Sequence, residues 1–488
     1  MTADKPSKTP TAHRIATSVL NPVGQSGDLE EFFQWFQEFG SRVYTDVETI
    51  GLDELSGWYT DAETGNIRHQ SGKFFTVEGL EVHVADSYFG QWSQPIIRQP
   101  EIGILGTVVR EIDGVLHFLM QAKVEPGNPH GLQLSPTVQA TRSNYTGVHR
   151  GRSVPYVEYF RDATDRHVLV DVRQSEQGSW FYQKRNRNMV VEVTEDIEVL
   201  DGFRWLTLGQ IHQLLAMDDV VNMDSRTVLA CMPFTGPGLA DRFTGRDVDR
   251  VGDGFAGALL RSCSTDARAR HTMDENLSWI TEARVRHQVT SRRIHLPEVK
   301  GWHRDSEKIS HERGLYFDVI GVRVTANGRE VTGWDQPMIR PRGTGIIAFL
   351  VKNIDGVLHA LVHARVEAGY FDVVELGPTV QCTPENYVGM PSAAAPRFLH
   401  EVLRSGGGRR VRYQTTLSEE GGRFFYALNR YQIIETELDV APDDPDYRWM
   451  TVHQLTELAK HSHYLNIQAR SLVACLHSLF ASAAEEAA

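Results

Sequence analysis

Hydrophobic residues recur along the chain with two different spacings, and these spacings predict both helices and strands. Between residues 29 and 36, leucine and phenylalanine follow the three-to-four-residue spacing of an amphipathic helix. Residues 104–125 instead form two apolar runs separated by Asp113-Gly114, a pair typical of a β-hairpin turn. The pattern therefore predicts a mixed α+β protein.

A long segment of the first half of the chain recurs in the second half. When residues 92–145 are aligned with residues 334–387 without a gap, about half of the positions are identical, which indicates an internal repeat rather than shared composition. Matching residues continue on both sides of this segment; for example, Gly57-Trp58 corresponds to Gly301-Trp302. The chain is therefore predicted to consist of two copies of one unit.

The same order of elements is expected in both copies. The second copy has its own apolar helix at residues 277–285 and repeats the hairpin turn at Asp355-Gly356. Thr207 and Thr451 each precede a glutamine by three residues, the spacing of a helix capping box. The boundaries are predicted as a disordered N-terminus at 1–27, a first domain at 28–233, a linker at 234–270, a second domain at 271–480 and a tail at 481–488.

The composition narrows the kinds of partner. With a formal net charge of -13 and a pI of about 5.9, the chain lacks the basic excess of a general nucleic-acid binder. The sequence has no apolar stretch typical of a membrane span or of a secretory signal, so we expect a cytoplasmic protein. Four widely spaced cysteines are expected to be reduced and mostly buried.

A set of polar and aromatic residues common to the two copies could bind a nucleoside diphosphate. An aromatic ring can stack on a base, and an arginine can donate two parallel hydrogen bonds to phosphate oxygens. The alternatives are that the tryptophans only pack in the core and that the basic residues form solvated ion pairs. The shared set consists of Trp92, Arg98, Lys123, Glu125, Gln139, Asn144 and Tyr145, and of Trp334, Arg340, Arg365, Glu367, Gln381, Asn386 and Tyr387.

Candidates for acid-base chemistry lie in and near the repeated Leu-x-Pro-Thr-Val-Gln segment. The residue immediately before this segment differs between the copies: it is Gln133 in the first and Glu375 in the second. Of the two, only Glu375 can take up a proton. Glu375 is therefore either a general base or only an acceptor for a sugar hydroxyl. Lys123 and the two tyrosines, Tyr145 and Tyr387, are the other candidates.

Two further patterns do not support a cofactor or a metal. The glycines of residues 252–257 match a dinucleotide fingerprint, but the residues before them are not a buried strand. The 20 histidines form no HExxH or HxH array. We therefore expect neither a cofactor nor a metal ion.

With these residues in view, the sequence resembles the NDP-hexose 2,3-dehydratases of bacterial deoxysugar pathways, which prepare sugars for natural products such as antibiotics. The segments GLQLSPTVQATRSNY and VVELGPTVQCTPENY and the duplicated WxQPxIR carry the resemblance, which spans residues 28 to 480. It implies two Nudix-like α/β/α sandwich domains in tandem, each with a dTDP-sugar pocket, in a homodimer. The glutamate-rich box of Nudix hydrolases is missing from both copies.

The resemblance implies a hydro-lyase that acts on dTDP-4-keto-6-deoxy-D-glucose and yields a 3,4-diketo-2,6-dideoxy sugar nucleotide. The reaction needs a base for the C3 proton, donors for the C4 enolate and an acid for the departing hydroxide. Glu375, or Lys123 with Tyr145, is expected to supply the base and the acid, and Gln133, Gln139 and Gln381 are expected to be donors. The competing hypotheses are a Nudix-type nucleotide-sugar pyrophosphohydrolase and a non-catalytic nucleotide-sugar-binding protein.

Overall fold

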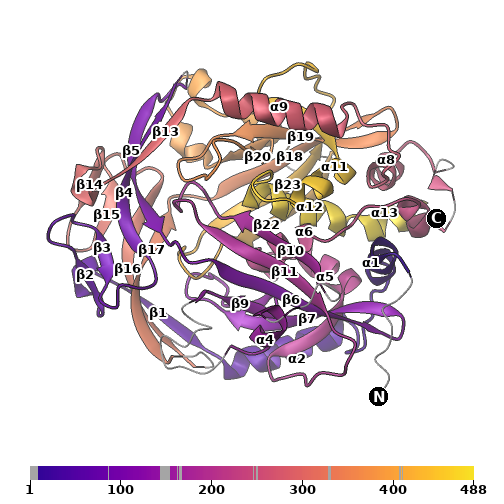
Figure 1. The fold of residues 1–488 in the computed structure, drawn as a ribbon, viewed down its shortest axis with the longest axis horizontal. Coiled ribbons are helices and arrows are strands. Elements are labelled where there is room, and N and C mark those ends of the chain that lie inside the picture. Colours follow the sequence, from indigo (N-terminus) through magenta and orange to yellow (C-terminus); the bar gives the residue numbers. More distant parts are fainter. Residues whose placement is uncertain are drawn as a thin grey trace.

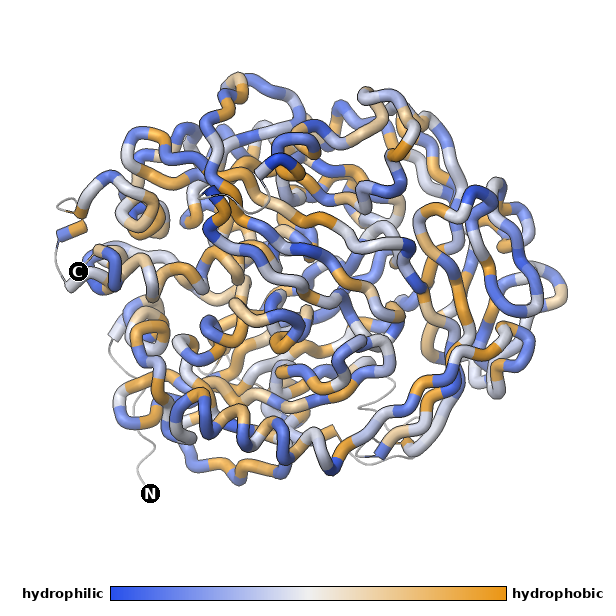
Figure 2. Tube along the Cα trace, turned by 180° about the vertical axis from the view of Figure 1, so that it is seen from behind, coloured by the Kyte–Doolittle hydropathy of each residue, from blue (hydrophilic) through white to orange (hydrophobic). Residues whose placement is uncertain are grey.

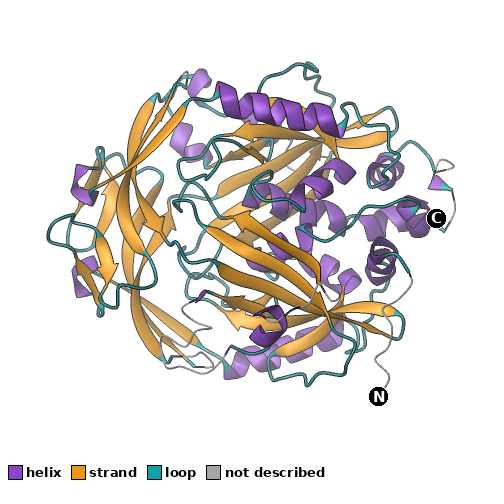
Figure 3. Ribbon diagram, in the orientation of Figure 1, coloured by secondary structure: helices purple, strands orange, loops and turns teal. Residues whose placement is uncertain are grey.

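A computed structural model of the chain describes residues 9–85, 87–142, 154–161, 163, 168–245, 247–248, 251–327, 331–405, 408 and 410–487. Mixed β-sheets and helices alternate along the sequence in the same order twice (Figures 1 and 3). The predicted α+β class and the tandem duplication are thus confirmed.

The elements of the first half and of the segment that joins the halves are α1 (Thr11–Val19), α2 (Leu29–Arg42), β1 (Thr45–Ile50), β2 (Trp58–Thr60), β3 (Ile67–His69), β4 (Thr76–Val84), β5 (Gln91–Arg98), β6 (Gly103–Ile112), β7 (Val115–Val124), β8 (Leu132–Ser135), β9 (Val138–Ala140), α4 (Val157–Arg161), β10 (Val168–Ser175), β11 (Arg185–Glu192), β12 (Phe203–Thr207), α5 (Leu208–Leu215), α6 (Met223–Ala230) and α7 (Leu239–Thr244). Those that follow are α8 (Phe255–Ser262), α9 (Met273–Arg286), β13 (Val289–Ile294), β14 (Trp302–Arg304), β15 (Lys308–His311), β16 (Phe317–Ala326), β17 (Gly333–Pro341), β18 (Gly345–Ile354), β19 (Val357–Arg365), β20 (Glu375–Gly377), β21 (Val380–Cys382), α10 (Leu399–Arg404), β22 (Val411–Ser418), β23 (Leu428–Glu435), β24 (Tyr447–Thr451), α11 (Val452–Ala459), α12 (Ile467–Ser478) and α13 (Phe480–Ala487).

Each half has one large sheet of seven strands. In the first half the strand order is β10-β11-β6-β7-β12, with β8 on β7 and β9 on β6, and the second half repeats this order. The predicted hairpin is β6–β7, and Asp113 and Gly114 at its turn have φ values of 51° and 77°. Positive φ at both central residues is the geometry of a type I′ turn, which glycine and aspartate tolerate best. The two predicted capping boxes, at Thr207 and Thr451, are also present.

The two smaller sheets exchange strands between the halves. β1 of the first half pairs with β16 of the second, and β13 of the second half pairs with β4 of the first. These sheets lie side by side at one end of the molecule, at the left of Figure 1. Neither half can therefore complete its small sheet alone.

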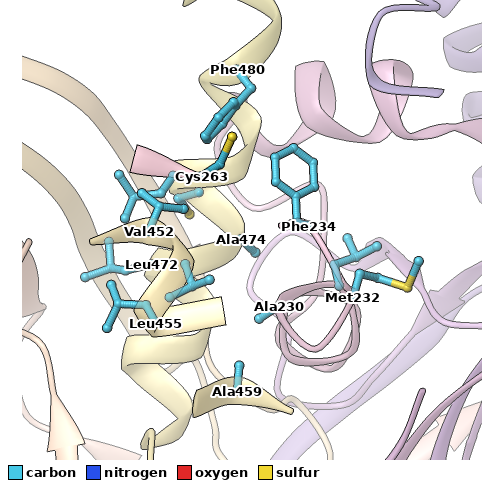
Figure 4. Packing of buried hydrophobic residues seen from close by; sticks show 14 of the residues in the cluster. Ala230, Met232, Phe234, Cys263, Val452, Leu455, Ala459, Leu472, Ala474 and Phe480 are labelled. Atoms are coloured by element: carbon cyan, nitrogen blue, oxygen red, sulfur yellow. The ribbon is translucent and has the colours of Figure 1, made fainter. Parts of the chain in front are cut away.

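The large sheets and their helices share one hydrophobic core. Along the chain, apolar and polar segments alternate as expected for sheets with a buried face (Figure 2). Phe234, at the end of the first half, packs against Phe480 of the second half with ring centroids 5.0 Å apart (Figure 4). Two buried arginines cross the boundary, because Arg226 Nη2 donates to the Ser418 carbonyl at 2.6 Å and Arg470 Nη2 donates to the Ser175 carbonyl at 2.5 Å.

The terminal and joining segments are more ordered than the sequence indicated. Disorder was expected before residue 28 and after residue 480, and a linker at 234–270, but α1, α7, α8 and α13 lie in these regions with buried apolar faces. Helices α1 and α8 are equivalent, since Ser18 Oγ and Ser262 Oγ both donate to a carbonyl of the hairpin and accept from the first amide of α5 or α11. The repeated unit therefore begins earlier than the alignment suggested, because contacts across the fold order these short segments.

Of the four cysteines, Cys231, Cys263 and Cys475 are buried and Cys382 is half-buried, and all are free thiols, as expected. No helix in the described part of the chain is long and apolar enough to cross a membrane.

Candidate functional site

A cavity of about 330 Å³, called the first cavity below, lies between the large sheet of the first half and the small sheet that contains β16 and β17. Lys123 on β7, Gln139 on β9 and Asn186 on β11 border it from the first half. Trp334 and Gln336 on β17 border it from the second half. Both halves of the chain thus build this cavity.

The second cavity, of about 730 Å³, has the reverse arrangement. Arg365 and Gln381 border it from the second half, and Trp92 and Gln94 on β5 border it from the first. Two matching hydrogen bonds fix the exchanged strands, since Trp58 Nε1 donates to the Asp335 carbonyl at 2.6 Å and Trp302 Nε1 donates to the Ser93 carbonyl at 3.1 Å.

A loop after β10 or β22 completes each cavity from the opposite half. Residues 177–180 reach the second cavity and residues 420–423 reach the first. Backbone hydrogen bonds hold both loops, because the Gly127 amide donates to the Gly421 carbonyl and the Gly369 amide donates to the Gly178 carbonyl, each at 2.7 Å. A Cβ at Gly127 would lie 1.8 Å from the Phe424 carbonyl oxygen, so only glycine fits there.

Charged side chains gather in the first cavity. Lys123 Nζ lies 3.7 Å from Glu125 Oε1, which also accepts a hydrogen bond from Gln139 Nε2 at 2.8 Å. Across from this pair, Arg423 Nη2 lies 2.8 Å from Glu420 Oε1, and both side chains are almost wholly shielded from solvent. The cavity therefore holds two pairs of a basic and an acidic side chain that are largely shielded from water, where electrostatic interactions are stronger.

Asp224 adds a third carboxyl group to the first cavity. It is the second residue of α6, is 3% exposed and borders the cavity. Burial raises its pKa well above the ordinary value, and the nearby carboxylates of Glu176, Glu125 and Glu420 raise it further. Asp224 therefore keeps its proton to a higher pH than an ordinary aspartate and can act as an acid.

Two more buried groups adjoin this cluster. Burial raises the pKa of Glu176, which accepts a hydrogen bond from Asn186 Nδ2 at 2.5 Å. Burial and the neighbouring Arg423 lower the pKa of Lys184 to about 7, and its ammonium donates to the Glu101 carbonyl. A group with a pKa near neutrality can exchange protons with little free-energy cost.

The second cavity has the same framework but different side chains at three positions of the charged cluster. Gln468 stands at the position of Asp224, Gln177 at that of Glu420, and Trp180 at that of Arg423. In place of Lys123 it has Arg365, whose Nε donates to Glu367 Oε1 at 2.8 Å and which keeps its proton in proteins. The second cavity therefore has no counterpart of the Lys123, Asp224 and Glu420 set, and His311, Tyr316 and Tyr387 are among its titratable groups.

The structure brings together many of the predicted residues. Lys123, Gln139 and Trp334 border the first cavity, and Trp92, Arg365, Gln381, Asn386 and Tyr387 border the second. Burial raises the pKa of the Tyr387 hydroxyl. Asn144 and Tyr145 lie outside the described residues.

Gln133 and Glu375 border neither cavity. Gln133 Nε2 donates to Asp219 Oδ1 at 2.6 Å and to Ser418 Oγ at 2.7 Å. Glu375 Oε2 accepts from Ser175 Oγ at 2.5 Å. Both are at most 1% exposed. The structure thus places these two side chains, on β8 and β20, in buried contacts with Ser418 and Ser175 of the other half and not in a cavity wall.

Arg98 and Arg340 also lie away from the two cavities. Arg340 Nη2 donates to Asp318 Oδ2 at 2.9 Å. Arg98 faces a separate depression of about 410 Å³, called the outer groove below. The expected contact of these two arginines with the diphosphate is not found at either cavity, because they lie six residues beyond Trp92 and Trp334, toward the far ends of β5 and β17.

Sequence reasoning missed Asp224, Glu420 and Arg423. The sequence does contain a signal for them. When the two halves are aligned, these charged residues correspond to the uncharged Gln468, Gln177 and Trp180. The positions at which the two copies differ in charge, and not only those that they share, thus indicate this cavity. Within the described ranges, no three His, Cys, Asp or Glu side chains come together as metal ligands would.

The duplicated fold, the two cavities built by both halves and the buried acid-base cluster in one of them define a small-molecule enzyme that transfers protons. The family model for NDP-hexose 2,3-dehydratases matches residues 29–232 and again residues 273–476, so the chain belongs to this family. A Saccharopolyspora spinosa protein named dTDP-4-dehydro-6-deoxy-α-D-glucopyranose 2,3-dehydratase is 52% identical over 96% of this chain and 95% of its own length.

Two other relatives carry the same name. The Amycolatopsis orientalis protein is 45% identical over 96% of this chain and 94% of its own length. The Streptomyces violaceoruber protein is 46% identical over 93% of this chain and 98% of its own length. The likeness therefore covers both halves and both cavities.

Proposed function

We propose that the chain is a hydro-lyase that removes the C2 hydroxyl of dTDP-4-keto-6-deoxy-D-glucose in deoxysugar biosynthesis, and that turnover takes place in the first cavity. The observation that carries the choice of cavity is a difference between the two copies. Lys123, Asp224 and Glu420 of the first cavity are replaced in the second by Arg365, Gln468 and Gln177. The names of the three relatives support the substrate and the reaction.

The chemistry needs no external electron carrier. The ketone at C4 makes the C3 proton acidic, and loss of that proton followed by loss of the C2 hydroxyl leaves a C2=C3 enol. The enol then takes a proton at C2 and releases one from the C3 oxygen, which gives the 3,4-diketo-2,6-dideoxy sugar. The protein has only to move protons and to stabilise the enolate.

The side chains of the first cavity can fill these roles. Lys123 takes the C3 proton in its neutral amine form, and Glu125, whose Oε1 lies 3.7 Å from Lys123 Nζ, orients that amine. Asp224, whose raised pKa favours the protonated form, gives its proton to the departing C2 hydroxyl, which leaves as water. Lys123 then returns a proton to C2 and Asp224 accepts the proton of the C3 hydroxyl, so both groups are reset. We retain Tyr145 as a candidate second acid because Tyr387, the equivalent residue of the second copy, borders the second cavity.

The nucleotide is held by the residues that the opposite half supplies. Trp334 offers a flat surface for a base, and Arg423 offers two N–H groups to an anionic oxygen. Gln139 and Asn186 are amide donors at the same cavity. In the second cavity Trp92 and Arg365 are placed to bind a nucleotide sugar without turnover.

Incubation of the purified chain with dTDP-4-keto-6-deoxy-D-glucose, followed by mass spectrometry, tests the function. We expect loss of one water and formation of the 3,4-diketo product. Release of dTMP in the presence of magnesium would instead indicate a pyrophosphohydrolase, and binding without any change would indicate a non-catalytic protein.

The cavity assignment is tested by exchanging residues between copies. We expect Lys123→Arg, which installs the residue of the second cavity, to lower kcat by about 100-fold or more while dTDP still binds. Arg365→Lys is the matched control and should change kcat little. The opposite pattern would place turnover in the second cavity.

The large sheet of the first half has α5 and α6 on one face and α4 on the other, and that of the second half has α11 and α12 on one face and α10 on the other. This arrangement supports a Nudix-like sandwich for each half. The family resemblance further leads us to expect a cytoplasmic homodimer, which light scattering after size-exclusion chromatography would test.

A further inference from the structure

The outer groove lies on the face of the small first-half sheet that points away from the first cavity. Three neighbouring strands place residues side by side there, because Arg68 is opposite Thr76 and Thr76 is opposite Arg98. Directly opposed residues of antiparallel strands point to the same face, with their Cβ atoms roughly 5 Å apart. The two guanidinium groups can therefore reach one small ligand above Thr76.

The charges that border the outer groove are mainly positive. Arg68, Lys73, Arg98 and Arg293 border it together with one carboxylate, Glu78. Glu78 is 4% exposed and is shared, since its oxygens lie 3.9 Å from Arg98 Nη1 and 3.2 Å from Arg293 Nη1. Among the described residues, the buried Nε of Arg68 has no hydrogen-bond partner. This excess of cations stands out in a chain of net charge -13.

The second half has the same strands but a neutralised surface. Ser310 is opposite Asp318, and Asp318 is opposite Arg340, so a carboxylate replaces Thr76 and a serine replaces Arg68. Asp318 is buried and accepts hydrogen bonds from Arg340 and Arg342, each at 2.9 Å. The cationic groove is therefore a property of the first half and not of the repeated fold.

We propose that the outer groove binds a phosphate group, either free or carried by a small molecule. Several arginines that converge on one open surface suit the tetrahedral oxygens of phosphate, which accept charge-assisted hydrogen bonds. Thr76 is small and uncharged, so an anion can bind between Arg68 and Arg98. In the second half, the carboxylate of Asp318 occupies the equivalent position and is itself the anion.

The outer groove opens on the other side of the sheet from the first cavity, and His69 borders both. Trp58 and Phe75 of the same sheet face the first cavity, whereas Arg68, Thr76 and Arg98 face outward. The failure of either proposal would leave the other untouched.

Calorimetric titration of the full chain with pyrophosphate tests the proposal, with inorganic phosphate and dTDP as parallel probes to distinguish a diphosphate, a single phosphate and a nucleotide. Thr76→Asp installs the carboxylate of the second half and should weaken binding at the groove by about tenfold or more. Thr76→Val is the matched neutral control and should keep the affinity within about twofold. Raised salt should weaken the binding, because the site is partly exposed.

Arg293→Thr provides a second variant, since Thr49 holds the equivalent position opposite β16. It should also weaken binding by about tenfold, whether or not Thr76→Asp folds. The proposal is overturned if the wild-type chain binds none of the three probes, or if Thr76→Asp or Arg293→Thr, folded by circular dichroism, binds them as tightly as Thr76→Val does.

Discussion

Asp224 and Gln468 occupy the same position in the two halves, as second residues of α6 and α12, and each borders the cavity of its own half. A carboxyl group in the first cavity thus corresponds to an amide, which cannot act as an acid at neutral pH, in the second.

Replacing Asp224 by Asn should lower kcat by about 100-fold or more with little change in KM, because the proton for the departing hydroxide is lost. Since the pKa of Asp224 is raised, wild-type activity should fall as the pH rises through that pKa and the acid loses its proton. Stopped assays across the pH range measure both effects. Gln468→Glu is the control in the second cavity and should leave kcat within about threefold.

Glu375→Gln tests the general-base hypothesis for that residue. Glu375 is buried against Ser175 and borders neither cavity, so we expect kcat to stay within about tenfold of wild type. The substitution keeps the shape and installs the residue found at the equivalent Gln133. A loss of several hundredfold in kcat, with the folded state intact, would restore Glu375 as the base.

Trp334→Ala should weaken dTDP binding to the first cavity by about tenfold to 100-fold, because stacking on a base is worth about 1–3 kcal/mol. Although Trp334 belongs to the second half, KM for the sugar nucleotide should rise. Trp92→Ala is the counterpart and should weaken a second binding event in calorimetry without raising KM. An equal rise in KM for both variants would contradict the assignment of turnover to the first cavity alone.

Gly127→Ala should destabilise the junction of the halves by about 1–3 kcal/mol, because the new Cβ would clash with the Phe424 carbonyl oxygen. Urea unfolding followed by fluorescence measures the free energy of unfolding. Gly252→Ala, where a Cβ meets nothing within 4 Å, is the control. Equal stability of the two variants would show that the loop accommodates the methyl group.

Buried histidines should make the fold sensitive to acid. Burial lowers the pKa of His477, which stacks on Phe234 at 4.2 Å, to about 3. The unfolded chain takes up this proton below pH 6.5 and the folded chain does not, so stability is present above pH 6.5 and is lost as the pH falls toward 3. At pH 5 the loss is about 2 kcal/mol for this residue.

His477→Asn should therefore reduce by about 2 kcal/mol the drop in the free energy of unfolding between pH 7 and pH 5, whatever its effect at pH 7. Urea titrations at the two pH values measure the drop. An unchanged drop would mean that His477 takes up its proton in the folded state.

Much of the local structure followed from short stretches of sequence. The turn at Asp113-Gly114 and the capping box at Thr207 depend on residues a few positions apart, and both were predicted correctly. Predictions failed for α1 and α8, whose sequences carry weak local signals. These helices are ordered by contacts such as that between Ser18 and the Leu116 carbonyl, on a strand far along the chain.

By itself the sequence determined the duplication, the family and the set of residues that the copies share, because repeats and periodic patterns are properties of the chain order alone. Only the tertiary structure decided that Trp334 meets Lys123 in one cavity, that Glu420 joins Asp224 there and that Glu375 does not. Those meetings depend on strands that pair across more than 200 residues, such as β1 with β16. Local propensity does not specify such pairs, whose stability comes from the core that both halves bury together.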